Sequence, residues 1–594
     1  METATTALLA ELSPEGHWIG ELSSSALSTA TAVTALTLVD RQTSSETHAR
    51  LISGGLRWLA AHANTDGGWG DTISSKSNIS TTALVWAAFG AAKADDEFRE
   101  TVKRTEAWLR KATGQPADAS GVPVQPLVEA IARRYGKDRT FSVPILMTCA
   151  LSGRLGADGW RYVHPLPFEL AALPHQLFGA LRLPVVSYAL PALIAIGQII
   201  HQFAPTANPI TRTFRDLTRA RTLDVLAAIQ PENGGFLEAT PLTSFVTMSL
   251  AGMGLANHVV ARKGAAFLTQ SVREDGSWPI DTNLATWVTT LSIKALSHQS
   301  ATLTPEQRLT LREWLLGQQY QVEHPYTHAA PFGWAWTNLP GGVPDADDTA
   351  GALLALTALG TVDSVSHFAG TRGVQWLLDL QNGDGGIPTF CRGWGALPFD
   401  RSSPDLTGHA LRAWCSWLPQ LSGLLKTRTL RAIARAVRFL KHAQRSDGSW
   451  LPLWFGNEHA PDDENPTYGT AQVLLALRLL REQSFALPTG LIEKATRWLV
   501  QAQSADGGWG GVPGGPASTE ETALAVEALA GSEHVAASDR GIEWLIARVE
   551  SGEWRAPAPI GFYFAKLWYF ERLYPLIFTV SALGKASALA RLHS

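Results

Sequence analysis

RAVRFLKHAQRSDGSW, at Arg435–Trp450, recurs as KATRWLVQAQSADGGWG at Lys494–Gly510. GTRGVQWLLDLQNGDGGI at Gly370–Ile387 is a third copy, and LREWLLGQQ at Leu311–Gln319 opens a fourth. Each copy reads as the end of an amphipathic helix that carries an aromatic residue, Leu and Gln. A glycine-rich turn follows, and beyond the turn there is usually a Trp. Such repeats predict stacked helical hairpins.

The same outline, in weaker form, extends over the rest of the chain. Degenerate copies end at Trp69, Phe236, Trp278 and Trp554, and a partial copy ends at Trp18. Ala- and Leu-rich stretches of helical composition lie between copies, and strand-like alternation is almost absent. We therefore predict an all-α fold of α/α barrels (toroids), with an open solenoid as the alternative. The repeat itself is interpreted as structural, with Gln bonding to neighbouring helix ends and Trp packing on them.

Composition excludes several classes of function. Hydrophobic residues make up 45% of the 594 residues and charged residues 17%, so the chain has ample material for cores. A formal net charge of -4 gives no electrostatic footprint for nucleic acid. The cysteines, Cys149, Cys391 and Cys415, form neither a disulfide framework nor a zinc pair. The opening METATTALLAELSPEG predicts no signal peptide. The 22 Trp residues are an excess that needs a reason.

One apolar stretch breaks the repeat pattern. Residues 183–210 contain no Asp, Glu, Lys or Arg. Its apolar run, Val185–Ile200, is shorter than the ~20 residues that a bilayer span needs, and Pro191 interrupts it. Two interpretations stay open: a buried core helix, or an apolar helix that lies in one membrane leaflet.

The sequence Asp345-Ala-Asp347-Asp348-Thr-Ala carries the most chemical information. Three carboxylates within four residues repel one another, so at least one should keep its proton near neutral pH. A retained proton is what an enzyme needs in order to protonate a weakly basic substrate. The alternative is an acidic helix start, with the Asp side chains capping the helix that follows.

Together with the repeats, this motif resembles the class II terpene cyclases, and specifically the squalene-hopene cyclases. The resemblance covers nearly the whole chain and follows the family's order of motifs. The stretches that carry it are GHWIGELSSSALSTATA (Gly16–Ala32), NLATWVTT (Asn283–Thr290), FGWAWTNLPGGVPDADDTA (Phe332–Ala350), PDLTGHALRAW (Pro404–Trp414) and GFYFAKLWYFERLYP (Gly561–Pro575).

The resemblance implies roles for the acidic motif. Asp347 would be the catalytic acid that protonates a terminal alkene, with Asp345 and Asp348 as its carboxylate neighbours. His409, in the element Asp405-x-Thr-x-His409, would hydrogen-bond to the acid and orient its proton. A protonated histidine would also make the acid stronger.

The resemblance also gives the aromatic residues a purpose. A protonated polyene becomes a carbocation, which aromatic faces stabilise by ~0.5–2 kcal/mol each without capturing it. No metal or other cofactor is expected, because protonation starts the reaction. The side chains implied to line the cavity are Trp287, Trp336, Phe390, Trp454, Phe562, Tyr569 and Tyr188.

Three positions depart from the family pattern. Ala558 stands where a late cation-stabilising Phe is expected, and Val288 replaces the Asp of a Trp-Asp pair. Pro466 stands where a tyrosine would help to hydrate the acid. These departures leave initiation intact and bear on the number of rings and on termination.

The complete prediction is two α/α barrels, one inserted into the other. Residues 1–20 plus 281–594 would form the catalytic barrel, and residues 21–280 the inserted barrel with a membrane-facing segment near 183–210. The expected substrate is a linear polyprene, squalene first, which would be cyclised to a hopene-like or partly cyclised triterpene. A monotopic position on the cytoplasmic side of a membrane and a homodimer are implied by the resemblance alone.

Other functions remain open at the level of sequence. The same acid could protonate a C15–C20 prenyl diphosphate, in which case a basic pocket is expected. A toroid without catalytic activity could serve as a binding scaffold, in which case the acidic motif would face solvent. A role like that of a protein prenyltransferase β subunit would need zinc, and no convincing set of ligands is visible.

Overall fold

The computed structural model describes residues 1–116, 121–136, 138–174, 188–299, 302–360, 362–390, 399–561 and 566–593. Helices dominate this part of the chain, which confirms the predicted all-α class. The strands are β1 (Ser24–Ser25) and β2 (Trp278–Pro279), which pair antiparallel with Ser25 opposite Trp278. Short 3₁₀ turns join several helices: η1 (Gly159–Tyr162), η2 (Phe168–Ala172), η3 (Phe236–Glu238), η4 (Leu418–Gln420), η5 (Pro461–Asp463) and η6 (Glu553–Arg555).

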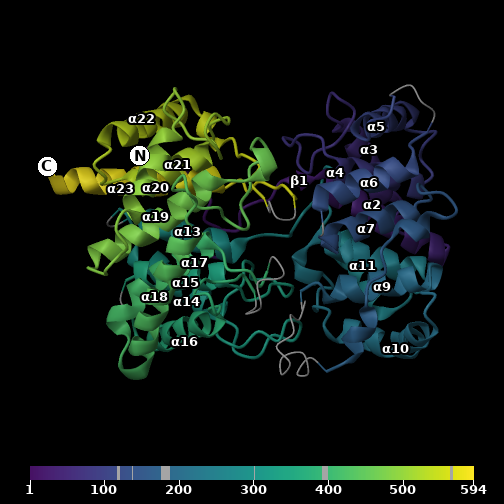
Figure 1. The fold of residues 1–594 in the computed structure, drawn as a ribbon, viewed down its shortest axis with the longest axis horizontal. Coiled ribbons are helices and arrows are strands. Elements are labelled where there is room, and N and C mark those ends of the chain that lie inside the picture. Colours follow the sequence, from purple (N-terminus) through teal and green to yellow (C-terminus); the bar gives the residue numbers. More distant parts are fainter. Residues whose placement is uncertain are drawn as a thin grey trace.

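The C-terminal half forms a closed ring of inner helices surrounded by outer ones (Figure 1). Each inner helix packs on the next, and the last returns to the first. In ring order they are α13 (Ala285–Leu296), α15 (Ala346–Ala358), α17 (Pro404–Trp417), α19 (Pro466–Glu482), α21 (Thr519–Leu529) and α23 (Tyr574–His593). The outer helices are α14 (Pro305–Gly317), α16 (Ser364–Leu380), α18 (Gly423–Ala443), α20 (Leu491–Gln501) and α22 (Val535–Ser551). The N-terminal helix α1 (Glu2–Ala10) packs on α23.

The second ring is built from the preceding part of the chain. Its inner helices pack in sequence and α11 closes on α2: α2 (Ala26–Thr43), α4 (Ile79–Ala91), α7 (Arg139–Leu151), α9 (Leu190–Phe203) and α11 (Thr240–Gly252). Around them lie α3 (Ala49–Ala61), α5 (Arg99–Ala112), α6 (Val124–Tyr135), α10 (Pro209–Ala228) and α12 (Val259–Gln270). Figure 1 shows the two rings side by side, with both chain termini in the C-terminal one.

Hydrogen bonds confirm the structural interpretation of the repeat. The indole N–H of the repeat Trp donates to the carbonyl of a Leu ten residues earlier, at 2.7–2.9 Å, in Trp18, Trp69, Trp278, Trp450 and Trp509. The repeat Gln donates both to its own turn and to the next outer helix. Gln444, for example, reaches the carbonyl of Gly448 at 3.0 Å and that of Leu491 at 3.0 Å. The repeat therefore joins each outer helix to its successor.

Each ring has its own buried apolar cluster. One cluster includes residues from Ala4 to Leu22 and from Ile280 to Leu583. The other runs from Ala26 to Trp278, with two later residues added. Trp336 packs against both clusters, so it lies where the rings meet. The domain bounds at 20 and 280 remain a prediction from the sequence.

Helix α9 carries the middle of the apolar stretch 183–210. Ile194, Ile196 and Ile199 on this helix are fully buried, because α9 is an inner helix of its ring, so this part of the stretch is a core helix. Residues 183–187 lie outside the described part of the chain. Phe203, at the end of α9, and Ile210, at the start of α10, are exposed, and a membrane-facing role for the stretch stays a prediction. Among the described residues, no helix is long and apolar enough to cross a bilayer.

Candidate active site

The repeat places the acidic motif at the start of an inner helix. Asp345 is the N-cap of α15, and its Oδ1 accepts a hydrogen bond from the backbone N–H of Asp348 at 2.8 Å. Its own N–H donates to the carbonyl of Trp334 at 3.0 Å. Ser518 occupies the equivalent position before α21, where it bridges to Trp509. One aspartate of the motif therefore caps the helix while another is free to act as an acid, and the two interpretations of the motif are compatible.

Asp347 is the aspartate of the motif that reaches a partner on another helix. Its Oδ1 lies 2.5 Å from Nδ1 of His409 on α17. The Asp347 side chain is 18% exposed, whereas Asp345 and Asp348 are almost completely buried. The structure thus brings together the four residues that the resemblance implied as the acid group. Their catalytic roles remain a proposal.

Burial alters the acidity of the neighbouring carboxyl groups. It raises the pKa of Asp345 to about 7, and it raises the pKa of Asp348 well above its ordinary value, with the charge of Asp345 adding to the effect. Asp405, at the start of α17, also has its pKa raised to about 7, mainly by burial. The expectation that at least one carboxyl of the motif keeps its proton near neutral pH is supported.

These carboxyl groups are also incompletely hydrogen-bonded. Among the described residues, buried Oδ2 of Asp345, Oδ1 of Asp348 and Oδ2 of Asp405 have no hydrogen-bond partner. A buried carboxylate without donors is costly, whereas a protonated carboxyl is much less so. The site therefore favours neutral acids around Asp347.

His409 differs from the expectation of a protonated imidazole. Burial lowers its pKa, although the nearby Asp347 opposes this shift. The charges of Arg412 and Lys294 lower the pKa further. A neutral imidazole can accept a hydrogen bond through Nδ1 from a protonated Asp347. The geometry suits a histidine that orients the proton of the acid.

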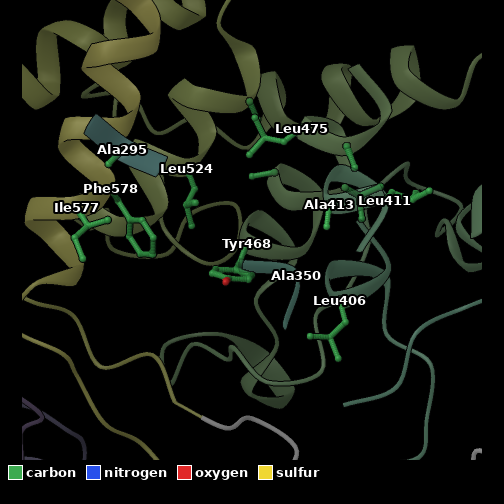
Figure 2. Packing of buried hydrophobic residues seen from close by; sticks show 14 of the residues in the cluster. Ala295, Ala350, Leu406, Leu411, Ala413, Tyr468, Leu475, Leu524, Ile577 and Phe578 are labelled. Carbon is green, nitrogen blue, oxygen red and sulfur yellow. The ribbon is translucent and has the colours of Figure 1, made fainter. Parts of the chain in front are cut away.

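A small cavity, with room for about one water molecule, lies inside the ring beside the acid. Every inner helix contributes to its wall, and Figure 2 shows some of the buried side chains of this ring, with Tyr468, Leu524, Ile577 and Phe578 among them. The full lining is Trp287, Leu291, Lys294, Asp347, Asp405, His409, Arg412, Tyr468, Gln472, Leu524, Ile577, Phe578 and Ser581.

The wall of this cavity also carries charged groups besides the acid. Nζ of Lys294 lies 3.0 Å from Oε1 of Glu527, and Oγ of Ser581 donates to Oε2 of the same carboxylate at 2.8 Å. Burial lowers the pKa of Lys294 to about 8. Sequence reasoning missed this group, because its members come from three helices that are far apart along the chain.

Two of the predicted aromatic residues lie near the acid. Trp287 meets His409 edge to face, with ring centroids 6.0 Å apart, and its indole N–H donates to Oη of Tyr574 at 3.0 Å. Oη of Tyr569 is 3.2 Å from the same Tyr574 hydroxyl. Tyr574 was not predicted, although it lies in the stretch that carries the resemblance near the C-terminus.

Other predicted aromatic residues form a second group where the rings meet. Phe390 lies 6.2 Å from Trp336, 5.9 Å from Trp454 and 5.8 Å from Tyr188, measured between ring centroids. Phe399, which was not predicted, packs 5.4 Å from Phe390. Phe562 lies outside the described residues.

Tyr468 lies near position 466, where the chain has Pro and the resemblance implies a tyrosine. Pro466 begins α19, and Tyr468 two residues later lines the cavity together with Asp347 and Asp405. A phenol is therefore present beside the acid, supplied one half-turn further along the helix. No group of three or more potential metal ligands occurs in the described part of the chain.

Paired helical rings with a buried acid at the start of an inner helix define a class II terpene cyclase. A family model for the squalene-hopene cyclase C-terminal domain matches residues 284–588, and one for the N-terminal domain matches residues 1–119. The chain belongs to the squalene-hopene cyclase family.

The individual proteins that the chain resembles are less than 30% identical to it in the matched regions. The chain is 26% identical over 494 residues to a squalene-hopene cyclase of Bradyrhizobium diazoefficiens, which covers 74% of this chain and 69% of that protein. It is 28% identical over 361 residues to enfumafungin synthase efuA of Hormonema carpetanum, where the match covers 55% of this chain but only 26% of that protein. The fold of ent-copalyl diphosphate synthase from Streptomyces platensis matches with a TM-score of 0.53 and 19% identity, over 99% of this chain and 98% of that one.

Proposed function

We propose that this protein protonates a terminal alkene of a linear polyprene, with squalene as the first candidate, and guides a cationic cyclisation to a hopene-like or partly cyclised triterpene. Asp347 would donate the proton as general acid, and His409 would orient it. The observation that carries this proposal is the 2.5 Å contact between Asp347 and His409, beside the buried carboxyl groups of Asp345 and Asp348, whose pKa values burial raises.

The position of the motif argues against a passive scaffold. A binding scaffold was expected to turn the acidic motif toward solvent, whereas Asp345 and Asp348 are 3% and 4% exposed. Buried carboxyls with unpartnered oxygens destabilise a fold and are retained at functional sites. The aromatic groups near Trp287 and near Phe390 supply faces on which a cation could be stabilised.

A prenyl diphosphate would need a pocket with surplus positive charge. A second cavity of about 360 Å³ is lined by two basic side chains, Arg273 and Arg572. Arg572 is paired with Glu11 through two contacts of 2.8 Å, and Arg273 lies 3.9 Å from Glu21. These cations are neutralised by carboxylates, so this cavity offers no surplus positive charge for a diphosphate.

Incubation of the purified protein with squalene and, separately, with geranylgeranyl diphosphate tests the proposal directly. Products are analysed by gas chromatography and mass spectrometry. We expect cyclised isomers or hydrates of squalene. Cyclisation of the diphosphate alone would replace squalene with the shorter substrate, and turnover of neither would contradict the proposal.

We also propose peripheral attachment to a membrane, from which the hydrocarbon would be drawn. Ile210, Phe214 and Leu217 are spaced along one face of α10 and are all exposed, at 81%, 43% and 77%. The paired change Phe214→Glu and Leu217→Glu should reduce co-sedimentation with phosphatidylcholine–phosphatidylglycerol vesicles severalfold. Val322→Glu, at an exposed apolar residue elsewhere, is the matched control. Equal binding by all three proteins would place the attachment elsewhere.

A further inference from the structure

A second buried acid lies beside Trp336, one of the aromatic residues proposed to stabilise the cation. Oδ2 of Asp281 accepts a hydrogen bond from the indole N–H of Trp336 at 3.1 Å. Its buried Oδ1 has no hydrogen-bond partner among the described residues. The sequence did not single out this residue, because a lone Asp after a repeat turn has no distinguishing pattern.

The backbone around Asp281 is fixed from both rings. Asp281 forms a bridge with Ala239 of the N-terminal ring. Two residues further on, Oδ1 of Asn283 accepts a hydrogen bond from Oγ1 of Thr337 at 2.8 Å. The carbonyl of Trp336 accepts from the N–H of Trp287 at 3.1 Å. The orientation of the Trp336 indole is therefore set against a rigid support.

Asp281 shares the electrostatic environment of the catalytic acid. Burial raises the pKa of Tyr569, and negative charge on Asp281 and Asp347 would raise it further, so both acids lie within range of one phenol. Burial also raises the pKa of Asp281 well above its ordinary value, and the charge of Glu238 adds to this effect. Glu238 is itself fully buried and accepts hydrogen bonds from Asn233 and from the N–H of Gly341, each at 2.7 Å.

A neutral carboxyl has a specific advantage in this place. A carboxylate beside a carbocation could trap it as an ester, whereas a protonated carboxyl is a poor nucleophile and its carbonyl oxygen still accepts a hydrogen bond from the indole. An indole fixed in this way presents a constant face to a passing cation.

We propose that Asp281 is a positioning residue that fixes the Trp336 indole and so sets how many rings form before the cation is quenched. This inference rests on the proposed function, because it assigns Trp336 to cation stabilisation. Asp281 takes no part in proton transfer in this account.

The product test compares Asp281→Ala with Asp281→Asn, since the amide retains an acceptor for the indole N–H. With squalene, we expect Asp281→Ala to raise the ratio of products with fewer rings roughly fivefold, which corresponds to ~1 kcal/mol at the branching step. Asp281→Asn should stay near the wild-type ratio. In a Trp336→Phe background, Asp281→Ala should add nothing. An unchanged ratio in Asp281→Ala, or equal ratios in both Asp281 variants, would overturn the proposal.

A second measurement separates this inference from the proposed function, because it needs no turnover. The indole N–H resonance of Trp336 is assigned in protein labelled with ¹⁵N-tryptophan by its loss in Trp336→Phe. We expect the resonance to shift clearly in Asp281→Ala and much less in Asp281→Asn. A resonance that stays in place in Asp281→Ala would refute the positioning role, even if squalene is not the substrate.

Discussion

Each ring buries a carboxyl group at the end that faces the other ring, and the two sites satisfy their oxygens differently. In the N-terminal ring, Oδ1 of Asp71 accepts from Thr81 and from Asn78, and Oδ2 accepts from the N–H of Trp568 at 2.8 Å. In the C-terminal ring, Asp345 and Asp348 are buried to a similar degree, yet each has an oxygen with no partner among the described residues.

Hydrogen bonding, more than burial, separates the two kinds of site. Burial raises the pKa of Asp71 as well, but its three hydrogen bonds oppose the shift. The fully hydrogen-bonded carboxyl group of Asp71 connects the two rings, since its hydrogen bond to the N–H of Trp568 runs from one ring to the other. A buried carboxyl group with an unpartnered oxygen favours its protonated form, as at the two neighbours of Asp347.

The interiors of the rings show the same contrast. In the N-terminal ring, buried hydroxyls bond to their own helices, as Thr34 does to the carbonyl of Ala30 at 2.8 Å and Ser249 to that of Phe245 at 2.7 Å. In the C-terminal ring, Lys294 and Arg412 line the cavity beside the acid. Two cations therefore line the interior of the C-terminal ring.

Removal of the proposed acid should have the largest effect. Asp347→Asn should lower cyclisation by ~10³-fold or more, because general acid catalysis is lost while the side chain keeps its shape. Circular dichroism and thermal melting should match the wild type. The control is Asp379→Asn at a surface ion pair with Arg428. Retained turnover in Asp347→Asn would remove this residue from the role.

Removal of the fully hydrogen-bonded carboxyl group of Asp71 should affect stability and not catalysis. Asp71→Ala leaves Thr81, Asn78 and the N–H of Trp568 without their acceptor, so the free energy of unfolding should fall by about 2–4 kcal/mol. Turnover per folded molecule should stay within about threefold of the wild type if the rings still meet. Urea denaturation and activity at low temperature measure the two quantities. A stable but inactive Asp71→Ala variant would contradict the claim that this carboxyl group has a structural and not a catalytic role.

Loss of the histidine should have an intermediate effect on chemistry. His409→Phe removes the partner of Asp347 and should lower cyclisation by about 10–100-fold. His409→Gln keeps a polar group in the same place and should lose less. Cyclisation rates measured at saturating substrate give the order of activity of the wild type, His409→Gln and His409→Phe. Equal rates for wild type and His409→Phe would show that the contact does not orient the proton.

The pH dependence of stability should be the smallest of these effects. The pKa of Asp345 is raised to about 7 in the folded protein, from about 3.9 when unfolded, so the folded state binds more protons between these values. The stability contributed by this group is complete below about pH 4 and is lost as pH rises through about 7. Between pH 5 and 7, the free energy of unfolding should therefore fall by about 1–2 kcal/mol less in Asp345→Asn than in the wild type, as measured by urea denaturation at each pH. Identical pH profiles would contradict the raised pKa.

Much of the fold could be predicted from the sequence because the repeat is local. The Leu-to-Trp spacing encodes a hydrogen bond within one copy, and the Gln encodes one between consecutive copies. The pairing of Asp347 with His409 came from the resemblance and not from spacing, since the two residues lie 62 positions apart.

The remaining features depend on how helices meet. Helical periodicity shows that Lys294, Arg412 and Glu527 lie on helices, but not that their side chains converge inside one ring. The apolar composition of α9 could not distinguish a membrane from a protein core, because both select the same residues. Tyr468 was missed because its reach toward the acid depends on where α19 begins.

Cyclisation of squalene in deuterium oxide tests the central claim most directly. If Asp347 protonates a terminal alkene with a proton drawn from solvent, each product molecule should carry one carbon-bound deuterium, visible as a mass increase of one unit that persists after washing in ordinary water. A cyclised product without carbon-bound deuterium would show that the reaction does not begin with a proton from the acid, and the account would be wrong.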